Sequence, residues 1–313
     1  MAFMKAVRIH SYGGPEVLLY EDVPKPEAAA GELLIRVYAA GVNPLDWKVR
    51  AGHAREWLQY RLPLTPGWDV SGVVEAVGAE VADFNTGDAV YCLLDLKRGG
   101  AHAEYVAAPA RDMARKPKSL DHVQAAAVPL AALTAWQSLF DLAKLSSGQS
   151  VLVHAAAGGV GHYAVQLAKW KGARVIGTAS GRNVDFVRGL GADEVIDYRT
   201  TRFEDAVGNV DVVFDTMGGD IQERSWRVVK RGGVLVATLG ISSPGVAAEC
   251  GVRGEGVLVH PDAGQLARIA ELADAGHLKP AIHAVFPLAE AAKAHELSQT
   301  GHVRGKIVLK LRD

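Results

Sequence analysis

The sequence predicts an α/β protein with two lobes, a β-barrel-type domain followed by a doubly wound parallel sheet. Short apolar segments separated by Gly and Pro turns occupy the first hundred residues, a pattern typical of antiparallel, barrel-like domains. From Val151 onward, strand-like and helix-like segments alternate regularly, as in parallel α/β sheets. A chain of 313 residues is long enough for both lobes.

The first lobe contains several strand patterns. The segment Glu32–Ala39 alternates branched apolar residues with polar or smaller ones, as a half-buried strand does. We expect a short helix after the turn at Asn43 and Pro44. The expected strands are Met4–Ile9, Glu32–Ala39, Val70–Val77 and Ala89–Leu93.

The composition changes after the first lobe. An Ala-rich helical stretch, Val123–Leu142, leads to Val151, so we place the boundary near Pro117. Residues 1–117 then form the catalytic-type domain, and residues 118–279 form the parallel-sheet domain. Near the C-terminus we expect helices at Gln265–Ala275 and Leu288–Thr300. Strands at 282–286 and 305–310 are expected to return to the first lobe, so that residues 280–313 complete it.

The chain is organised around Val151–Lys169, where an apolar strand, a small-residue turn and an amphipathic helix follow one another. This order opens a dinucleotide-binding βαβ unit, because a turn without bulky side chains lets a pyrophosphate approach the helix N-terminus. The glycine pattern is incomplete, since Ala156 replaces the first glycine, and close packing alone also favours small residues there. The turn residues predicted to bind a nucleotide are Ala157, Gly158, Gly159 and Val160.

The surrounding pattern supports nucleotide binding over packing alone. Four further strands without internal proline follow the helix, which gives a repeating strand–helix rhythm. They are Arg174–Thr178, Glu194–Ile196, Val210–Phe214 and Val234–Leu239.

Composition excludes several classes of partner. A net charge of −1 argues against nucleic acid, whose binding depends on clustered basic residues. No apolar run reaches the ~20 residues needed to span a bilayer, and the N-terminus lacks the apolar core of a signal peptide. Two cysteines, Cys92 and Cys250, form no metal or redox spacing. We therefore expect a cytoplasmic protein that acts on a small molecule.

Several motifs, in order along nearly the whole chain, resemble the medium-chain dehydrogenase/reductase superfamily and its zinc-free quinone oxidoreductase branch (zeta-crystallin-like). The resemblance implies a GroES-like catalytic domain, a Rossmann cofactor domain and an active site in the cleft between them. The motifs are MKAVRI with Gly13–Glu16, Gly41–Asp46, Pro66–Val74, Gly87–Tyr91, Ala103–Tyr105, Leu133–Ala135, Gly158–Gly161 and Gly305–Val308.

The same resemblance predicts that the chain holds no metal in the manner of the family. Zinc-dependent members carry a Cys where this chain has Asn43 and a His where it has Trp68, together with a four-cysteine lobe that is missing here. Zinc requires thiolate or imidazole ligands at tetrahedral spacing. Scattered surface or core residues are the simplest interpretation of the eleven histidines.

The end of the second strand of the parallel sheet favours NADPH over NADH. NAD sites carry a carboxylate about 20 residues past the glycines, whereas this chain has Ser180 and Arg182 there. A guanidinium suits a 2′-phosphate, although Arg182 could instead be a solvated helix-start residue. The resemblance implies that Tyr198 lies against the same phosphate.

The resemblance also assigns residues around the reactive ring. It implies that Asn43 lies near the nicotinamide ribose, that Thr134 contacts the nicotinamide, and that the backbone after the fifth strand reaches the carboxamide. Lys48 could face the substrate oxygen, but a surface ammonium is the favoured interpretation. The backbone residues are Leu239, Gly240 and Ile241.

The substrate pocket is expected to include Trp47, Tyr60 and Trp68, with Trp68 either lining it or packing under Asn43. Many members of the branch have a tyrosine near Trp47 that this chain lacks, so Tyr60 is a weak substitute as proton donor. Asp69 is expected to be a structural hydrogen-bond acceptor.

Taken together, these features predict a zinc-independent, NADPH-dependent oxidoreductase that reduces quinones or α,β-unsaturated carbonyls. The alternative is a non-catalytic NADPH-binding or scaffold protein of the same fold. A homodimer is expected to form through the edge of the parallel sheet, with Gly256–Val259 as the edge segment. His154 and Cys92 are expected to be core residues.

Overall fold

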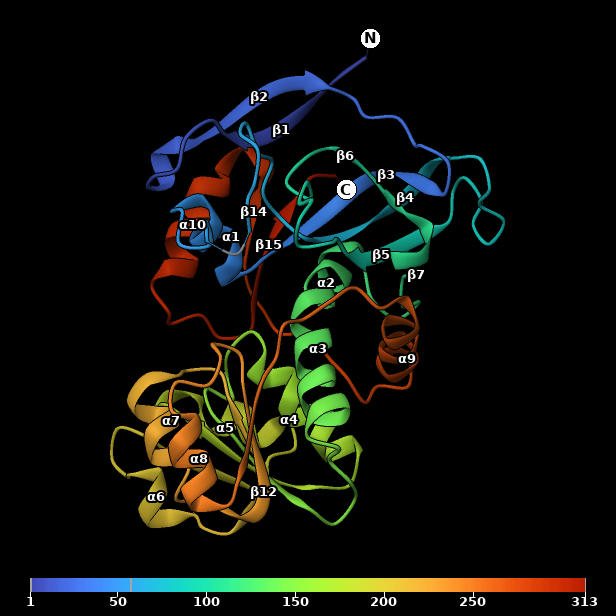
Figure 1. Ribbon diagram of the computed structural model, residues 1–313. Helices are drawn as coiled ribbons and strands as arrows, with labels where there is room; N and C mark the ends of the chain where they lie inside the picture. Colours follow the sequence, from blue (N-terminus) through green and yellow to red (C-terminus); the bar gives the residue numbers. More distant parts are fainter. Residues whose placement is uncertain (1, 57, 313) are drawn as a thin grey trace. The chain divides into compact units, whose positions relative to one another are not determined.

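A computed structural model describes residues 2–56 and 58–312 (Figure 1). The chain divides into two compact units. Unit 1 contains residues 1–130, 260–276 and 280–313, and unit 2 contains residues 131–259 and 277–279. Among the described residues, no helix combines the length and apolar character needed to cross a bilayer.

Unit 1 is built on a mixed, largely antiparallel sheet with the order β14-β15-β3-β4-β5-β7 and with β6 paired to β3. A separate antiparallel ribbon joins β1 and β2. The strands are β1 Phe3–Ile9, β2 Leu18–Pro24, β3 Glu32–Val42, β4 Asp69–Val77, β5 Ala89–Leu93, β6 Tyr105–Pro109, β7 Ala114–Arg115, β14 Ile282–Pro287 and β15 Lys306–Lys310.

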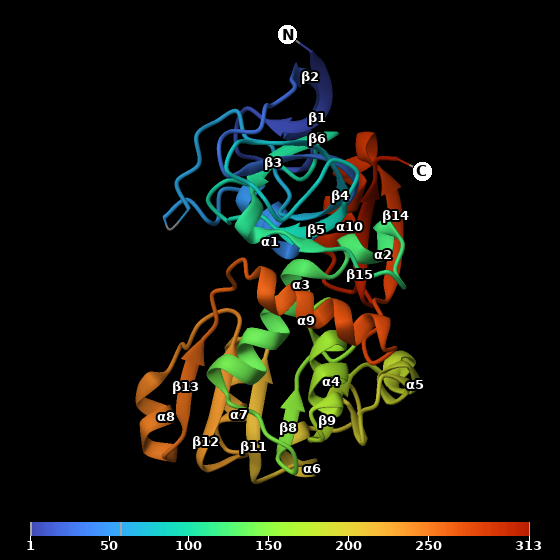
Figure 2. The same cartoon turned by 90° about the vertical axis from the view of Figure 1, so that its right-hand side faces the viewer.

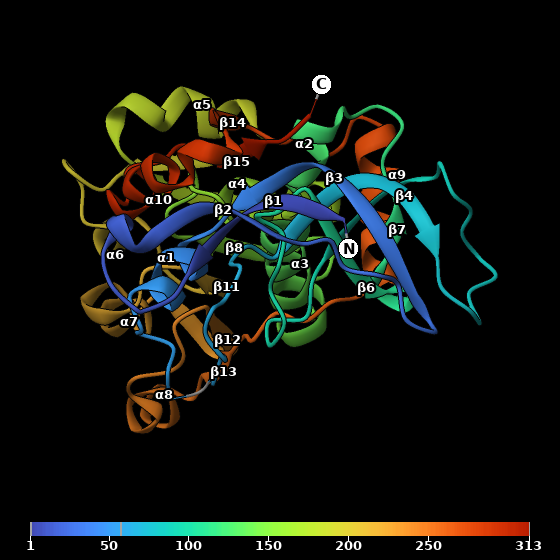
Figure 3. The same ribbon diagram turned by 90° about the horizontal axis from the view of Figure 1, so that it is seen from above.

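The helices of unit 1 pack around this sheet. Figure 3 shows α10 and the C-terminal strands β14 and β15, in red, beside the blue N-terminal ribbon. Helix α10 contacts α1, so two segments distant in sequence become neighbours. The helices are α1 Pro44–Arg50, α2 His122–Ala126, α9 Ala263–Asp274 and α10 Ala291–Gln299, with short turns of helix at Pro15–Val17, Ala110–Asp112 and Leu288–Glu290.

Unit 2 is a parallel six-stranded sheet with the order β10-β9-β8-β11-β12-β13. Figure 2 shows β13, β12, β11 and β8 side by side. The near-continuous apolar sequences of β8 and β11 match their burial on both faces. The strands are β8 Ser150–Val153, β9 Arg174–Ala179, β10 Glu194–Asp197, β11 Val210–Asp215, β12 Val229–Ala237 and β13 Arg253–Gly256.

Helix α3 Pro129–Trp136 and a π-helical turn Gln137–Leu142 lead into β8. Further helices connect the strands in the right order for a doubly wound fold. They are α4 Gly161–Trp170, a 3₁₀ turn Gly181–Asn183, α5 Val184–Gly189, α6 Phe203–Ala206, α7 Gly219–Ser225 and α8 Pro244–Cys250.

The structure confirms the predicted fold class, but several element boundaries differ from expectation. The single helix expected over Val123–Leu142 is broken before Pro129, because the residue preceding a proline is driven out of the helical region. Strand β12 ends at Ala237, so Leu239 lies in the following loop. The edge strand is β13, and only Gly256 of the expected edge segment belongs to it. The homodimer stays a prediction.

The short segment His122–Ala126 packs on β3 and β4, which places it with unit 1. The boundary expected near Pro117 stays a prediction, since compactness alone places residues up to 130 with unit 1.

Close packing of α4 on the turn after β8 depends on Gly161, the first residue of the helix. A Cβ at this position would lie 2.3 Å from the Ala155 carbonyl oxygen and 2.9 Å from the Cα of Ala156. Both atoms belong to the backbone and cannot rotate away. The bare Cα therefore sets how closely the helix approaches the strand.

We expect Gly161→Ala to lower the free energy of unfolding by about 1–3 kcal/mol, because the added methyl group forces the backbone apart. Gly189→Ala, at the end of α5, is the matched control, since no atom lies within 4 Å of its Cβ position. That change should be neutral or stabilise the protein by up to about 1 kcal/mol. Urea unfolding measures both, and equal midpoints for the two variants would contradict this role of Gly161.

Candidate functional site

Four loops of unit 2 converge on the carboxyl edge of its sheet. Residues Ala157–Val160 follow β8, and Leu239–Ile241 lie beyond the end of β12. The β9 strand is followed by Ser180 and Arg182, and the neighbouring β10 is followed by Tyr198. Strand β8 lies between β9 and β11, which is the point where the strand order reverses. Ligands of doubly wound sheets bind at this switch point.

The turn after β8 presents backbone amides. The Ala156 amide donates to the Thr178 carbonyl at 2.9 Å, and the Gly158 amide donates to the Ala155 carbonyl at 2.8 Å. These bonds hold the turn, whereas the amides of Gly159 and Val160 find no acceptor within the described part of the chain. Free amides at a helix N-terminus fit the pyrophosphate of a dinucleotide.

The predicted adenosine end brings three residues to two adjacent strand ends. Ser180 is buried at the start of a 3₁₀ turn, and the Arg182 side chain extends into solvent. Tyr198 is about half exposed, at 52%, and its amide donates to the Ala179 carbonyl at 3.1 Å. The exposed guanidinium is therefore available to an anionic ligand.

Sequence reasoning missed an acid at this end of the site. Asp197 closes β10, and its Oδ2 atom would lie 2.6 Å from a Cβ on Gly181. Its Oδ1 atom accepts from the Arg199 amide at 3.0 Å. The acid typical of NAD sites follows the second strand of the sheet, whereas Asp197 reaches the same place from the end of the neighbouring strand β10.

The loop after β12 is fixed by a glutamine that the sequence analysis did not single out. Gln222 on α7 donates through Nε2 to the Gly240 carbonyl at 2.9 Å and to Asp215 at 3.0 Å. Its Oε1 atom accepts from the Ser242 amide at 2.9 Å. In the sequence, an aspartate at the end of the mostly apolar strand β11 was the one indication that a polar partner such as Gln222 lies nearby. Gln222 and Asp215 together hold the loop that is predicted to reach the carboxamide.

Thr134, predicted to contact the nicotinamide, is buried on α3 in unit 2.

The predicted core residues are confirmed in both units. The imidazole of His154 is hydrogen-bonded to Ser225 at 2.9 Å and to Thr178 at 3.2 Å. Cys92 is completely buried, and burial raises the pKa of its thiol.

Asn43 belongs to a buried polar network in unit 1. It precedes α1, and its Nδ2 atom donates to Asp69 Oδ2 at 2.8 Å. The ammonium of Lys306, from β15, donates to Asn43 Oδ1 and lies 3.4 Å from Asp69 Oδ2. Asp69 also accepts from the Leu130 amide at 2.6 Å, so it is the structural acceptor that the sequence predicts.

Lys306 is the functional candidate that sequence reasoning missed in unit 1. Its side chain is only 3% exposed, and Asn43 is only 2% exposed. The motif Gly305–Val308 was noted, but a lysine on a terminal strand is usually a solvated residue. Only the pairing of β15 with β3 brings the ammonium to Asn43.

The remaining predicted residues of unit 1 do not join this network. The Lys48 ammonium lies 5.8 Å from the centroid of the Trp47 ring, on the partly exposed face of α1. Trp68 is completely buried and donates to the Leu96 carbonyl at 3.1 Å. The hydroxyl of Tyr60 donates to the same carbonyl, and Tyr60 lines a hollow of about 270 Å³ with Glu56, Leu58, Gln59 and Lys97.

The positions that bind catalytic zinc in related dehydrogenases do not fit a metal here. The Asn43 amide is engaged by Lys306 and Asp69, and the Trp68 indole has only a donor to offer, which Leu96 accepts. Zinc needs thiolate, imidazole or carboxylate ligands. Asn43 and Trp68 therefore do not serve as zinc ligands.

Family models match two stretches of the chain. Residues 29–118 match the alcohol dehydrogenase GroES-like domain, and residues 190–309 match a model described as zinc-binding dehydrogenase. The latter description belongs to the family as a whole.

Individual relatives cover almost all of the chain. It is 37% identical to the NADPH-dependent alkenal/one oxidoreductase, chloroplastic, of Arabidopsis thaliana, over 98% of this chain and 79% of that protein. It is 35% identical to the quinone oxidoreductase of Sus scrofa, over 98% of both chains. The solved quinone oxidoreductase from Coxiella burnetii superposes with a TM-score of 0.93 at 39% identity, over 99% of this chain and 100% of that one.

The fold, and the loops at the carboxyl edge of the parallel sheet of unit 2, define a nicotinamide-dependent oxidoreductase. More narrowly, the chain belongs to the medium-chain dehydrogenase/reductase superfamily, in its quinone oxidoreductase branch.

We expect Lys306→Met to lower the free energy of unfolding by about 3–5 kcal/mol, because it leaves the buried Asp69 carboxylate without its cation. Lys293→Met is the control, since that exposed lysine pairs with Glu290 on the surface and should contribute at most about 1 kcal/mol. Urea unfolding of both variants measures the difference. A Lys306→Met protein as stable as Lys293→Met would show that the network does not hold unit 1.

Proposed function

We propose that the protein is an NADPH-dependent reductase of quinones or α,β-unsaturated carbonyls that works without catalytic zinc. The observation that carries the proposal is the turn after β8, where the backbone amides of Gly159 and Val160, at the start of α4, have no acceptor among the described residues. The names of the relatives, an alkenal/one oxidoreductase and a quinone oxidoreductase, indicate the substrate class.

When bound, the nicotinamide supplies the hydride, and the protein positions and polarises. The amides after β8 bind the pyrophosphate, and the loop held by Gln222 binds the carboxamide through Leu239–Ile241. Thr134 contributes to nicotinamide binding from α3. The Asn43 amide, fixed by Lys306 and Asp69, supplies a preoriented polar group in unit 1.

A quinone is already electrophilic and needs little acid catalysis. For an enone, hydride reaches the β-carbon, and the proton that reaches the α-carbon is supplied by water. Tyr60 donates to the Leu96 carbonyl, and burial raises the pKa of its phenol, so it holds its proton tightly. Lys48 is placed beside Trp47 on α1 as a partly exposed ammonium. We therefore propose no dedicated side-chain acid.

Arg182 supports NADPH over NADH. Its exposed guanidinium follows β9 and can form charge-assisted hydrogen bonds with a 2′-phosphate. Asp197 opposes an anion at this end, but its Oδ1 atom is engaged by the Arg199 amide. Tyr198, beside it, adds a hydroxyl that can donate to the same phosphate.

Purified protein mixed with NADPH, and separately with NADH, should oxidise the nicotinamide in the presence of acceptors from a panel of quinones and enones. Loss of nicotinamide absorbance measures turnover. Tight NADPH binding with no oxidation by any acceptor would favour the non-catalytic scaffold instead. The same panel decides between quinones and enones.

Arg182→Ala should weaken NADPH binding about tenfold or more, because one charge-assisted hydrogen bond is lost, and should leave NADH within about twofold. Fluorescence titration of the two nucleotides measures both constants. Arg188→Ala is the control, since this exposed arginine of α5 faces Asp185 and should leave the ratio unchanged. Equal weakening of both nucleotides by Arg182→Ala would remove the 2′-phosphate assignment.

A further inference from the structure

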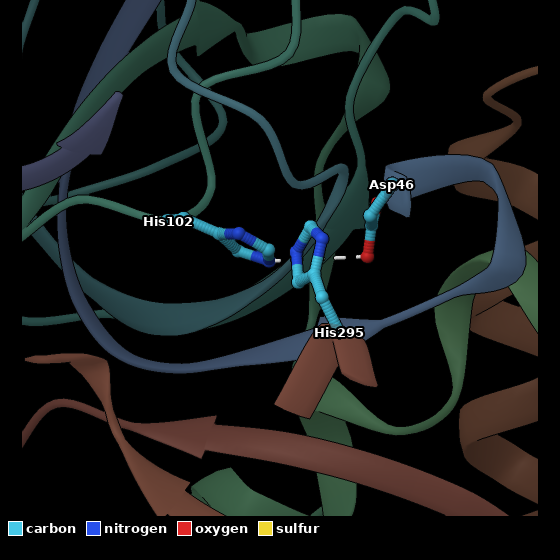
Figure 4. Close-up of side chains that lie close together, drawn as sticks. All are labelled: Asp46, His102 and His295. Carbon is cyan, nitrogen blue, oxygen red and sulfur yellow. Dashed lines mark ion pairs between the residues drawn. The ribbon is translucent and has the colours of Figure 1, made fainter. Parts of the chain in front are cut away.

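A second cluster in unit 1 takes no part in the proposed reduction. Asp46 lies on α1, His102 in the loop between β5 and β6, and His295 on α10 (Figure 4). All three side chains are completely buried. Each offers a ligand atom, and these atoms lie within 4.8 Å of one another.

The cluster is incomplete as a hydrogen-bonded network. Both ring nitrogens of His102, both of His295 and the Oδ1 atom of Asp46 have no hydrogen-bond partner among the described residues. In Figure 4 the dashed line joins His102 Nε2 to Asp46 Oδ2 at 3.9 Å, which is too long for a hydrogen bond. One ligand atom from each of the three residues lies at the same buried place, and buried polar atoms without a partner require something to satisfy them.

The donor set is that of a metal site. Two imidazole nitrogens and one carboxylate oxygen are typical ligands of zinc, with a water in the fourth position. Both imidazoles are completely buried, and imidazole is the commonest protein ligand of metal ions.

We propose that Asp46, His102 and His295 bind one divalent transition-metal ion, with zinc as the best match, and that this ion is structural. The site uses neither Asn43 nor Trp68. It would tie α1 to α10 and to the loop after β5. The backbone amide of Asn43 donates to Asp46 Oδ2 at 2.6 Å. An ion bound to Asp46 would therefore also fix the start of α1, the helix that follows Asn43.

Charged neighbours limit the strength of such a site. Arg50 on α1 brings a positive charge near His295, held by the Gly13 carbonyl at 3.3 Å and Gln299 at 2.9 Å. Lys306 and Asp69 add one charge of each sign near Asp46. The charges of Lys306 and Asp69 partly cancel. The affinity for the ion therefore depends mainly on direct coordination by Asp46, His102 and His295.

The test uses full-length protein expressed in zinc-supplemented medium, passed through gel filtration and washed briefly with chelator to remove surface ions. Elemental analysis should find one zinc per chain in the wild type. His102→Gln and His295→Gln should each retain at least about tenfold less. His122→Gln is the control, since this half-buried histidine of unit 1 is engaged by Ser71 and should keep the ion. Circular dichroism checks that each variant folds.

Cobalt-substituted wild-type protein keeps the test decisive if a variant fails to fold. The expected spectrum has the visible bands of tetrahedral cobalt without thiolate charge transfer, and added zinc should raise the melting temperature over chelated protein. A wild type that holds no stoichiometric ion would overturn the site and assign the cluster to buried water. Zinc at the wild-type level in His102→Gln or His295→Gln, or thiolate bands from Cys92 or Cys250, would overturn it too.

Discussion

The buried ammonium of Lys306 is the constraint on which unit 1 depends. It is held by Asn43 and Asp69, and a buried charge is tolerated only when it is paired. The pairing requires β15 beside β3 and β3 beside β4, with Ile307 opposite Val42. It also requires the bare Cα of Gly41, where a Cβ would lie 2.4 Å from the Ala126 carbonyl and 2.6 Å from Asp69 Oδ2. The sheet register and the polar site are therefore one arrangement.

In unit 2, by contrast, the groups predicted to bind the nucleotide belong mostly to the backbone. Parallel strands end at one edge, so the loops after β8, β9, β10 and β12 lie at the same edge of the sheet. The side chains serve the loops, as Gln222 does when it joins Asp215 to the Gly240 carbonyl. In the proposed function, the amides after β8 and the charge of Arg182 hold the nucleotide, and the packed strands keep these groups in place.

The sequence analysis predicted most elements because hydrophobic periodicity is local. The alternation of Glu32–Ala39 and the strand–turn–helix of Val151–Lys169 each report their own burial pattern. It placed the nucleotide residues at loops that the structure brings to one edge. It missed Gln222 and Lys306, because a glutamine on a helix and a lysine on a terminal strand look like surface residues until their partners are known.

By itself, the sequence determined the fold class, the glycine-rich turn, and a chain without zinc ligands at Asn43 and Trp68, since these depend on residue type and on spacing over a few positions. Tertiary structure alone decided that Lys306 meets Asn43 across 263 residues and that Asp46, His102 and His295 share one buried point. Such contacts between distant residues depend on strand order and helix packing. Segments far away in the sequence decide whether a polar residue is buried, so its burial cannot be predicted from the local sequence pattern.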